Sequence, residues 1–139
     1  MKTTYYIWED TYTQRVVDDA LQLTANNKGW IGGGYESASP FDNKILTDGY
    51  DLVFEIKTTV ESELSVQLTS RNPEAAQSVR LSFDRDGDWH TIRLDLKNMF
   101  PKVNKAWSEG ANGYVFSIIG GADVGKTISL RNIRYERSF

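Results

Sequence analysis

Residues 50–58 read Tyr-Asp-Leu-Val-Phe-Glu-Ile-Lys-Thr, a stretch in which apolar and polar side chains alternate. A period of two with one apolar face is typical of a β-strand that packs on a core and shows its other face to water. The same pattern recurs at 63–70, 77–84 and 89–96, with no room for helices between these segments. Short strands in this arrangement predict an all-β fold in which two sheets pack face to face.

Outward from this stretch, the same pattern predicts nine strands, which are separated by turn sequences such as Asp48-Gly49 and Asp86-Gly87. The predicted strands are 4–9, 16–24, 28–35, 50–58, 63–70, 77–84, 89–96, 112–119 and 127–136. The longest irregular segments are 36–49 and 97–111, and the second of these is expected to hold one short helical turn near Val103 to Trp107. The chain has no internal repeat or linker, so residues 1–139 are predicted to form a single domain.

Eight of these strands can be laid out as a jelly-roll β-sandwich of two antiparallel sheets, with strand 4–9 added at one edge. One sheet would contain 28–35, 112–119, 63–70 and 77–84. The other would contain 16–24, 127–136, 50–58 and 89–96.

The composition is that of an ordinary soluble globular protein, since 40% of the 139 residues are apolar and 25% are charged. The net charge of −3 argues against nucleic-acid and anionic-membrane partners, which select a basic face. The absence of cysteine excludes disulfides, thiolate metal sites and cysteine nucleophiles. The N-terminal residues do not read as a signal peptide, because Glu9 and Asp10 follow so soon. A cytoplasmic protein and a module of a longer secreted chain both remain open.

Residues 120–127 read Gly-Gly-Ala-Asp-Val-Gly-Lys-Thr and match the phosphate-binding pattern G-x-x-x-x-G-K-T. That loop binds phosphate only when a helix follows it, so that the first amides of the helix face the phosphates. Here residues 128–135 alternate like a strand. We therefore interpret 120–127 as a hairpin loop rather than a nucleotide site.

Metal and catalytic motifs are weak. Residues 84–88 place three aspartates at alternate positions, as in a calcium loop, but the glycine lies at the fourth position rather than the sixth. An Asp-Gly turn explains the segment as well, and a structural calcium ion held elsewhere is left open. His90 is the only histidine, so no Ser-His-Asp arrangement is supported. The spacing of the glutamates favours no glycosidase pair, and we expect no enzyme activity.

The aromatic residues are more informative. Trp30 and Tyr35 flank the three glycines 32–34, which leave open surface for a flat ligand. Trp107 lies in the loop 97–111, where it either packs the loop onto the core or stands at the rim of a groove. Trp8 is ambiguous, with packing by the N-terminal strand as the simpler interpretation, and Trp89 is expected to cap the core.

Such residues suit the recognition of sugars. The apolar C–H face of a pyranose ring rests on an aromatic ring, and its hydroxyl groups need fixed planar hydrogen-bonding groups. In the predicted layout, Gln67 and Arg80 point outward from the sheet that carries the glycine-flanking aromatics. The candidate ligand-binding residues are therefore Trp30, Tyr35, Gln67, Arg80 and Trp107. The alternative is that these are ordinary solvated residues.

The runs 50–57, 87–94 and 130–135 resemble the carbohydrate-binding modules of the family 4 and family 22 type. More particularly, the chain is similar to modules within or beside the family 10 xylanases of gut Bacteroidetes. The resemblance implies a non-catalytic β-sandwich whose cleft holds a soluble β-glycan, with xylan or xylo-oligosaccharide as the first guess. It also implies an extracellular or cell-surface module covalently linked to a glycoside hydrolase, with no required cofactor, although such modules usually carry a structural calcium ion.

Two other functions remain open at this point. One is a protein–protein or assembly module, which would use a strand edge or loops in place of a cleft. The other is a small hydrolase or lyase, which would produce new sugar ends on prolonged incubation.

Overall fold

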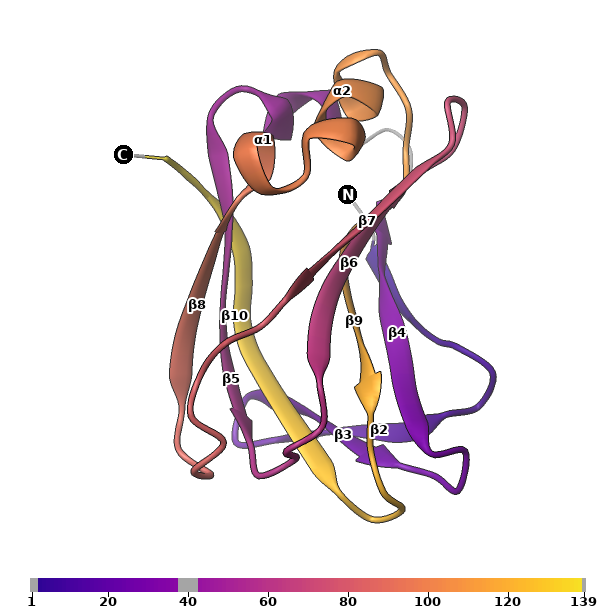
Figure 1. The fold of residues 1–139 in the computed structure, drawn as a ribbon, viewed down its shortest axis with the longest axis vertical. Coiled ribbons are helices and arrows are strands. Elements are labelled where there is room, and N and C mark those ends of the chain that lie inside the picture. The colour runs from indigo at the N-terminus through magenta and orange to yellow at the C-terminus, as the bar shows by residue number, and fades with distance from the viewer. Residues whose placement is uncertain (1–2, 38–42, 139) are drawn as a thin grey trace.

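The computed structural model describes residues 3–37 and 43–138, which form a sandwich of two antiparallel sheets with five strands each (Figure 1). The first sheet has the order β1 (Thr3–Ile7), β4 (Trp30–Ser37), β9 (Tyr114–Gly121), β6 (Leu64–Ser70) and β7 (Ala75–Arg80). The second has the order β2 (Tyr12–Val17), β3 (Ala20–Ala25), β10 (Thr127–Arg137), β5 (Tyr50–Thr58) and β8 (His90–Asp95). The all-β sandwich expected from the alternating pattern is confirmed.

Three short helices lie at one end of the sandwich, and the β2–β3 hairpin crosses the opposite end (Figure 1). These helices are η1 (Asn43–Thr47), α1 (Leu96–Met99) and α2 (Pro101–Ser108). Asp95 caps α1 because its carboxylate accepts a hydrogen bond of 3.1 Å from the backbone N–H of Asn98. The helical turn expected near 103–107 is confirmed as part of α2.

The predicted division of the strands between the two sheets is also confirmed, with β1 at the edge where strand 4–9 was expected. The single strand predicted at 16–24 is wrong, because the chain reverses within it. Asp18 and Asp19 adopt φ angles of 51° and 62°, a left-handed conformation that aspartate tolerates better than most residues. The turn separates β2 from β3, which pair with each other as an antiparallel hairpin.

The core lies between the sheets and is built from the inward-facing positions of each strand. Leu52, Phe54 and Ile56 of β5 are fully buried, as the alternation of residues 50–58 predicts. Leu64, Val66 and Leu68 of β6 repeat the pattern from the other sheet. The period of two therefore decides which face of each strand points outward, although Asp51 and Val53 on the outer face of β5 are buried as well.

The segment 120–127 links β9 of the first sheet to β10 of the second, so the hairpin loop predicted there is wrong: the two strands do not pair, and the loop crosses between the sheets. An 11-residue strand follows the loop in place of a helix. The phosphate-binding interpretation fails for that reason, as the sequence predicts. Gly125 occupies the turn with a φ of +82°.

Candidate functional site

The alternation of β4 places a row of glycines on the outer face of the first sheet. Ile31 is fully buried between the sheets, so the even-numbered residues Trp30, Gly32 and Gly34 share the opposite face. Trp30 is half-buried there. The outer face of this strand thus combines one indole with bare backbone.

Two tryptophan rings lie on Gly32. A methyl group at this glycine would lie 2.6 Å from Cζ3 of Trp30 and 2.8 Å from Cε3 of Trp8. The backbone N–H of Trp8 donates a hydrogen bond of 2.9 Å to the carbonyl of Gly32, which continues the pairing of β1 with β4. Because Gly32 has no side chain, both rings can lie directly on the strand.

Two tyrosines extend this surface. The ring of Tyr114 contacts those of Trp8 and Tyr6 edge to face, with centroid distances of 5.5 Å and 6.3 Å. Tyr6 is 44% exposed. We call Tyr6, Trp8, Trp30 and Tyr114 the aromatic platform.

The rings of the platform come from three neighbouring strands, β1, β4 and β9, with Trp8 directly after the end of β1. Trp30 stands at one end of β4, while Trp8 and Tyr6 lie opposite Gly32 and Gly34. Tyr114 is opposite Glu36. The rings nevertheless lie close together, because both indoles lie over Gly32 and the ring centroid of Tyr114 is 5.5 Å from that of Trp8. The platform is therefore a compact cluster of rings, over which an extended chain can pass.

Polar side chains lie beside the platform on the same face. Along one row, Gly32 pairs with Ile119, Ile119 with Ser65, and Ser65 with Arg80. Arg80 forms an exposed ion pair of 2.6 Å with Glu63. Gln67 is half-buried, and its amide has no hydrogen-bond partner among residues 3–37 and 43–138. The amide of Gln67 is therefore available to a ligand, whereas Arg80 and Glu63 are exposed but already bonded to each other.

The structure brings three of the five predicted site residues to this face, namely Trp30, Gln67 and Arg80. Tyr35 lies on the opposite face of β4, because it is five positions along the strand from Trp30, which is an odd spacing. Its ring packs edge to face on Tyr5, with centroids 4.5 Å apart, and burial raises the pKa of its hydroxyl. Trp30 and Tyr35 therefore do not form one surface.

Trp107 lies in the core. Its ring has no exposed surface, and its Nε1–H donates a hydrogen bond of 3.0 Å to the carbonyl of Thr69. Of the two alternatives that the sequence leaves open for Trp107, the structure shows the one in which it packs the segment 97–111 onto the core. Trp107 holds α2 against β6 and offers no ring face to a ligand.

Sequence reasoning missed Tyr6, Trp8 and Tyr114. The sequence does contain a signal for Tyr6 and Trp8: they are two positions apart in a predicted strand, and such residues share one face of the sheet. The position of Tyr114 and the contact of Trp8 with Gly32 depend on the register of three strands, which cannot be read from the sequence.

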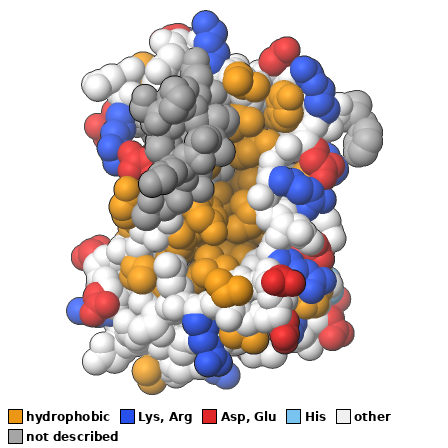
Figure 2. Space-filling model, turned by 180° about the vertical axis from the view of Figure 1, so that it is seen from behind, with side chains coloured by type: hydrophobic (Ala, Val, Ile, Leu, Met, Phe, Trp, Pro, Cys, Tyr) orange, Lys and Arg blue, Asp and Glu red, His pale blue; other side chains and the backbone are white. Residues whose placement is uncertain are grey.

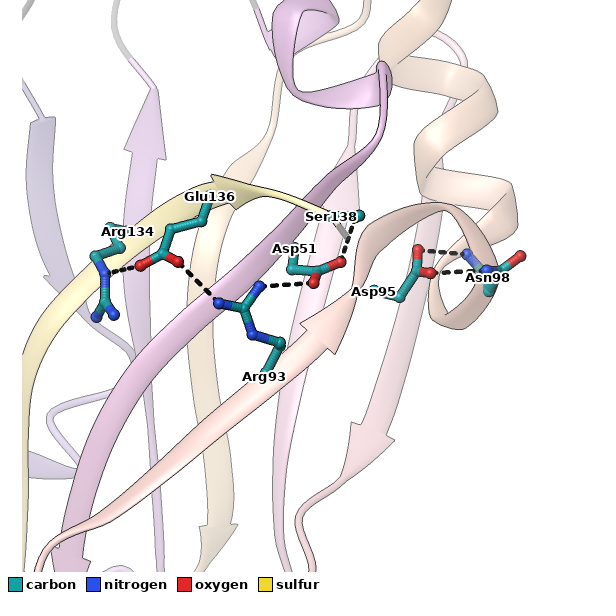
Figure 3. Close-up of polar contacts among 7 residues, drawn as sticks. All are labelled: Asp51, Arg93, Asp95, Asn98, Arg134, Glu136 and Ser138. Carbon is teal, nitrogen blue, oxygen red and sulfur yellow. Dashed lines mark hydrogen bonds and ion pairs between the residues drawn. The ribbon is translucent and has the colours of Figure 1, made fainter.

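The outer face of the second sheet is different in character, because its charged groups are already paired (Figure 3). Arg93 donates hydrogen bonds of 2.8 Å to both Asp51 and Glu136, and Arg134 donates one of 2.5 Å to Glu136. Burial tends to raise the pKa of Asp51, but hydrogen bonds from Ser138 and Arg93 outweigh it and hold the pKa below its ordinary value. The pKa of Glu136 is lowered by Arg134 and Arg93.

Trp89 belongs to this second face and does not cap the core as expected. The guanidinium carbon of Arg131 lies 3.9 Å from the ring centroid, and the Nζ of Lys57 lies 5.2 Å from it. Arg131 also pairs with Glu55 at 2.9 Å. Hydrogen bonds from Asn132 and Arg131 lower the pKa of Glu55. The indole is thus covered by cations, unlike the rings of the aromatic platform.

The described residues contain no group of three or more histidine, cysteine or acidic side chains that could hold a metal ion. In the segment 84–88, Asp86 accepts a hydrogen bond of 3.0 Å from the backbone N–H of Asp88 and lies 2.8 Å from Nε2 of His90. The bond to His90 lowers the pKa of Asp86. In the same described part of the chain, no helix is long and apolar enough to cross a membrane.

No protein-family model and no curated protein sequence matches the chain. Solved structures do match it. A variant of a family 29 carbohydrate-binding module superposes with a TM-score of 0.63 at 12% identity, over 96% of this chain and 81% of that one. A family 30 carbohydrate-binding module gives a TM-score of 0.59 at 14% identity, over 97% and 78%. The chain has the fold of a carbohydrate-binding module.

The same fold occurs as one part of longer proteins. PfGH50B matches with a TM-score of 0.70 at 12% identity, over 99% of this chain but 23% of that one. An exo-β-agarase matches over 97% of this chain and likewise 23% of its own, at 14% identity and a TM-score of 0.66. At these identities the likeness shows the fold and nothing finer.

Proposed function

We propose that this chain is a non-catalytic module that binds a β-linked polysaccharide along the aromatic platform. The observation that carries the proposal is the seating of Trp8 and Trp30 on the bare backbone of Gly32. Rings held in this way form an apolar strip on which the C–H faces of successive sugar rings can stack.

Polar contacts would come from the flank of the platform. The unpartnered amide of Gln67 can donate to and accept from sugar hydroxyl groups, and the exposed ion pair of Arg80 with Glu63 offers further donors and acceptors. A second ion pair, Arg71 with Glu36 at 2.9 Å, lies at the Tyr114 end. These charges balance, which favours a neutral glycan over an anionic one.

The ligand class rests on two supports. A variant of the family 29 module was also solved in complex with cellulohexaose. A β-glucan chain is therefore the second ligand to test with this chain. The sequence resemblance to xylanase-associated modules keeps xylan as the first. No cofactor is needed for stacking and hydrogen bonding, and a structural calcium ion stays a prediction.

The role would be to hold an attached glycoside hydrolase near its substrate, in an extracellular or cell-surface protein. Tethering raises the effective concentration of substrate without tight intrinsic affinity. We expect weak binding, micromolar to millimolar, or about −4 to −8 kcal/mol. The fold's occurrence as one part of an exo-β-agarase supports a role of this kind.

Affinity electrophoresis tests the proposal. The purified chain is run through native gels that contain xylan, arabinoxylan, mixed-linkage glucan, xyloglucan or mannan. We expect retardation by at least one β-glycan, with xylan tested first. The variants Trp8→Ala and Trp30→Ala should lose most of the retardation. Trp89→Ala, which removes an indole from the opposite face, is the matched control and should retain it.

Two results would contradict the proposal. One is the absence of retardation in every gel, which would favour the assembly-module alternative. The other is a loss of binding in Trp89→Ala as large as in the two platform variants, which would move the site to the second sheet.

A further inference from the structure

The aromatic platform lies apart from the apolar interior of the sandwich. Figure 2 shows a strip of hydrophobic side chains down the side of the molecule that faces away in Figure 1. A cavity of about 610 Å³ between the sheets is lined by Tyr35 and Phe116, among others, but by none of the four platform residues. None of these four belongs to the hydrophobic core or packs against it. The position of Trp8 over Gly32 must therefore come from the backbone around it.

Trp8 opens a tight turn that leads from β1 to β2. The backbone N–H of Thr11 donates a hydrogen bond of 3.0 Å to the carbonyl of Trp8, three residues back. Glu9 and Asp10, which lie between them, have φ angles of 48° and 58°. Positive φ at both central residues is characteristic of a type I′ turn. The turn therefore fixes the backbone of Trp8 relative to that of Thr11.

The side chain of Thr11 ties this turn to Gly32. Its Oγ1 accepts a hydrogen bond of 3.1 Å from the backbone N–H of Gly32 and donates one of 3.3 Å to the carbonyl of the same residue. That carbonyl also accepts the hydrogen bond of 2.9 Å from the N–H of Trp8. Thr11 has no exposed surface. One buried hydroxyl thus satisfies backbone groups that lie beyond the β1–β4 ladder, which ends at the pair Ile7 and Gly33.

Loss of this hydroxyl would leave the backbone N–H of Gly32 buried without a partner, which costs more than the hydrogen bond itself contributes. The turn must then move or admit water. Because Trp8 and Thr11 are bonded to Gly32 and to each other, such a movement carries the indole with it. With the hydroxyl in place, the ring needs no ordering when a sugar stacks on it, which favours binding.

We propose that Thr11 is a positioning residue of the glycan site, which holds the indole of Trp8 over Gly32 before a ligand binds. Thr11 is covered and touches no ligand itself, so it acts only through the position of the ring. Its effect on affinity rests on the proposed function. Its effect on Trp8 does not, and can be measured in the free chain.

Thr58 offers a matched control on the second sheet. Its Oγ1 likewise accepts one backbone hydrogen bond, of 3.0 Å from the N–H of Val60, and donates one of 2.8 Å to the carbonyl of Thr127. It is also buried. Thr11→Val and Thr58→Val therefore remove equivalent bonds from side chains of the same shape, and only the first lies beside the platform. Both should lower the thermal midpoint by a similar amount, about 3 to 10 °C.

The test uses the whole chain, labelled with ¹⁵N. In the free chain, we expect Thr11→Val to shift the indole N–H signal of Trp8 and to speed the exchange of its backbone amide about tenfold or more. In calorimetric titration with xylohexaose or cellohexaose, it should weaken binding about fivefold or more, because one of the two stacking rings is displaced. Thr58→Val should leave the Trp8 signal in place and the affinity within about twofold. Thr11→Ser restores the hydroxyl and should return both readouts towards those of the parent.

A milder change tests the same turn if Thr11→Val does not fold. The side-chain amide of Asn26 donates a hydrogen bond of 2.8 Å to the carbonyl of Asp10 at the surface. Asn26→Ala removes this bond without leaving a buried group unpaired. It should shift the Trp8 signal less than Thr11→Val does and weaken glycan binding about twofold to threefold.

Three results would overturn the proposal. One is a Trp8 signal that stays in place in every folded turn variant, and another is a shift as large in Thr58→Val. The third is an unchanged affinity in a folded Thr11→Val chain whose parent binds the glycan. A shifted Trp8 signal in Thr11→Val, together with a parent that binds no glycan, would support the positioning role and contradict only the proposed function.

Discussion

Replacing Gly32 by alanine should abolish glycan binding without removing any aromatic side chain. The added methyl carbon would stand 2.6 Å from Trp30 and 2.8 Å from Trp8, measured to their nearest ring carbons. Carbon atoms in contact are normally 3.5 to 4.0 Å apart. Each ring must therefore move by about 1 Å, and the two can no longer lie directly on the backbone of Gly32.

The cost to binding follows from the area of a stacked ring. An aromatic side chain buries 150 to 250 Å² in all, of which one indole face is about a third, so a stacked sugar is stabilised by roughly 1.8 kcal/mol per ring. Displacing two rings removes up to about 3.5 kcal/mol. Even partial loss should exceed the 1.4 kcal/mol that corresponds to a tenfold change in affinity.

The cost to stability should be smaller. Overpacking costs about 1 to 3 kcal/mol in a closed core, but these rings are half-exposed and can swing outward. Alanine also recovers about 0.5 to 1 kcal/mol relative to glycine within a strand. We therefore expect Gly32→Ala to fold with nearly unchanged stability.

Calorimetric titration with an oligosaccharide, paired with thermal unfolding, measures both effects. Gly49→Ala is the control, because a methyl group there meets nothing within 4 Å but is strained by the φ of +72°. That variant should lose about 1 to 2 kcal/mol of stability and keep its affinity. A folded Gly32→Ala variant with the parent affinity would refute the claim that the position of the two rings on Gly32 creates the site.

The remaining predictions concern single contacts. Trp107→Phe should lose about 1 to 3 kcal/mol in a denaturant titration, because it removes the buried hydrogen bond to Thr69, and should leave glycan affinity unchanged. Gln67→Ala should weaken glycan binding about threefold to tenfold in the same calorimetric assay, the net value of one hydrogen bond. Folding lowers the pKa values of Asp51 and Glu55, because their partners stabilise the ionised carboxylates. The resulting stability is fully present at a pH above the pKa values of the unfolded chain, which lie near 4. It is lost as the pH falls below these pKa values and the carboxylates become protonated. Thermal midpoints should thus be flat above about pH 5 and fall below about pH 4, and midpoints that do not fall there would contradict the lowered pKa values.

The fold could be predicted from the sequence because its signal is local. The alternation in residues 50–58 predicts which side chains face the core, and the order and number of the strands, laid out as a jelly roll, divide them between two sheets. Two connections were predicted wrongly. The loop 120–127 crosses between the sheets and is not a hairpin, and the single strand at 16–24 is broken by a turn of Asp18 and Asp19 that lacks glycine, proline or asparagine. Two consecutive aspartates can supply the required positive φ, but they occur just as well within an exposed strand face.

The site was harder to predict because it depends on register. Gln67 and Arg80 were placed on the outer face from the alternation and the strand order within one sheet, and Trp30 was singled out by the glycines beside it. Tyr35 was predicted on the same surface as Trp30 because both flank the glycines 32–34. Its odd spacing from Trp30 instead places it on the inner face of β4. Trp8 was missed because its role becomes visible only when Gly32 lies opposite it. Propensity and pattern within one strand carry no information on such cross-strand pairs.

The four tryptophans allow a direct test of the central claim, because each occupies a different environment. Their indole N–H groups should give four peaks in a ¹H–¹⁵N spectrum of the labelled chain, to be assigned by single substitutions. On titration with a xylo-oligosaccharide or cello-oligosaccharide, we expect the signals of Trp8 and Trp30 to move in a saturable way. Those of Trp107 in the core and Trp89 on the opposite face should stay still. Movement of Trp89 with Trp8 and Trp30 unchanged, or no movement under any of the glycans that retard the protein, would contradict the account.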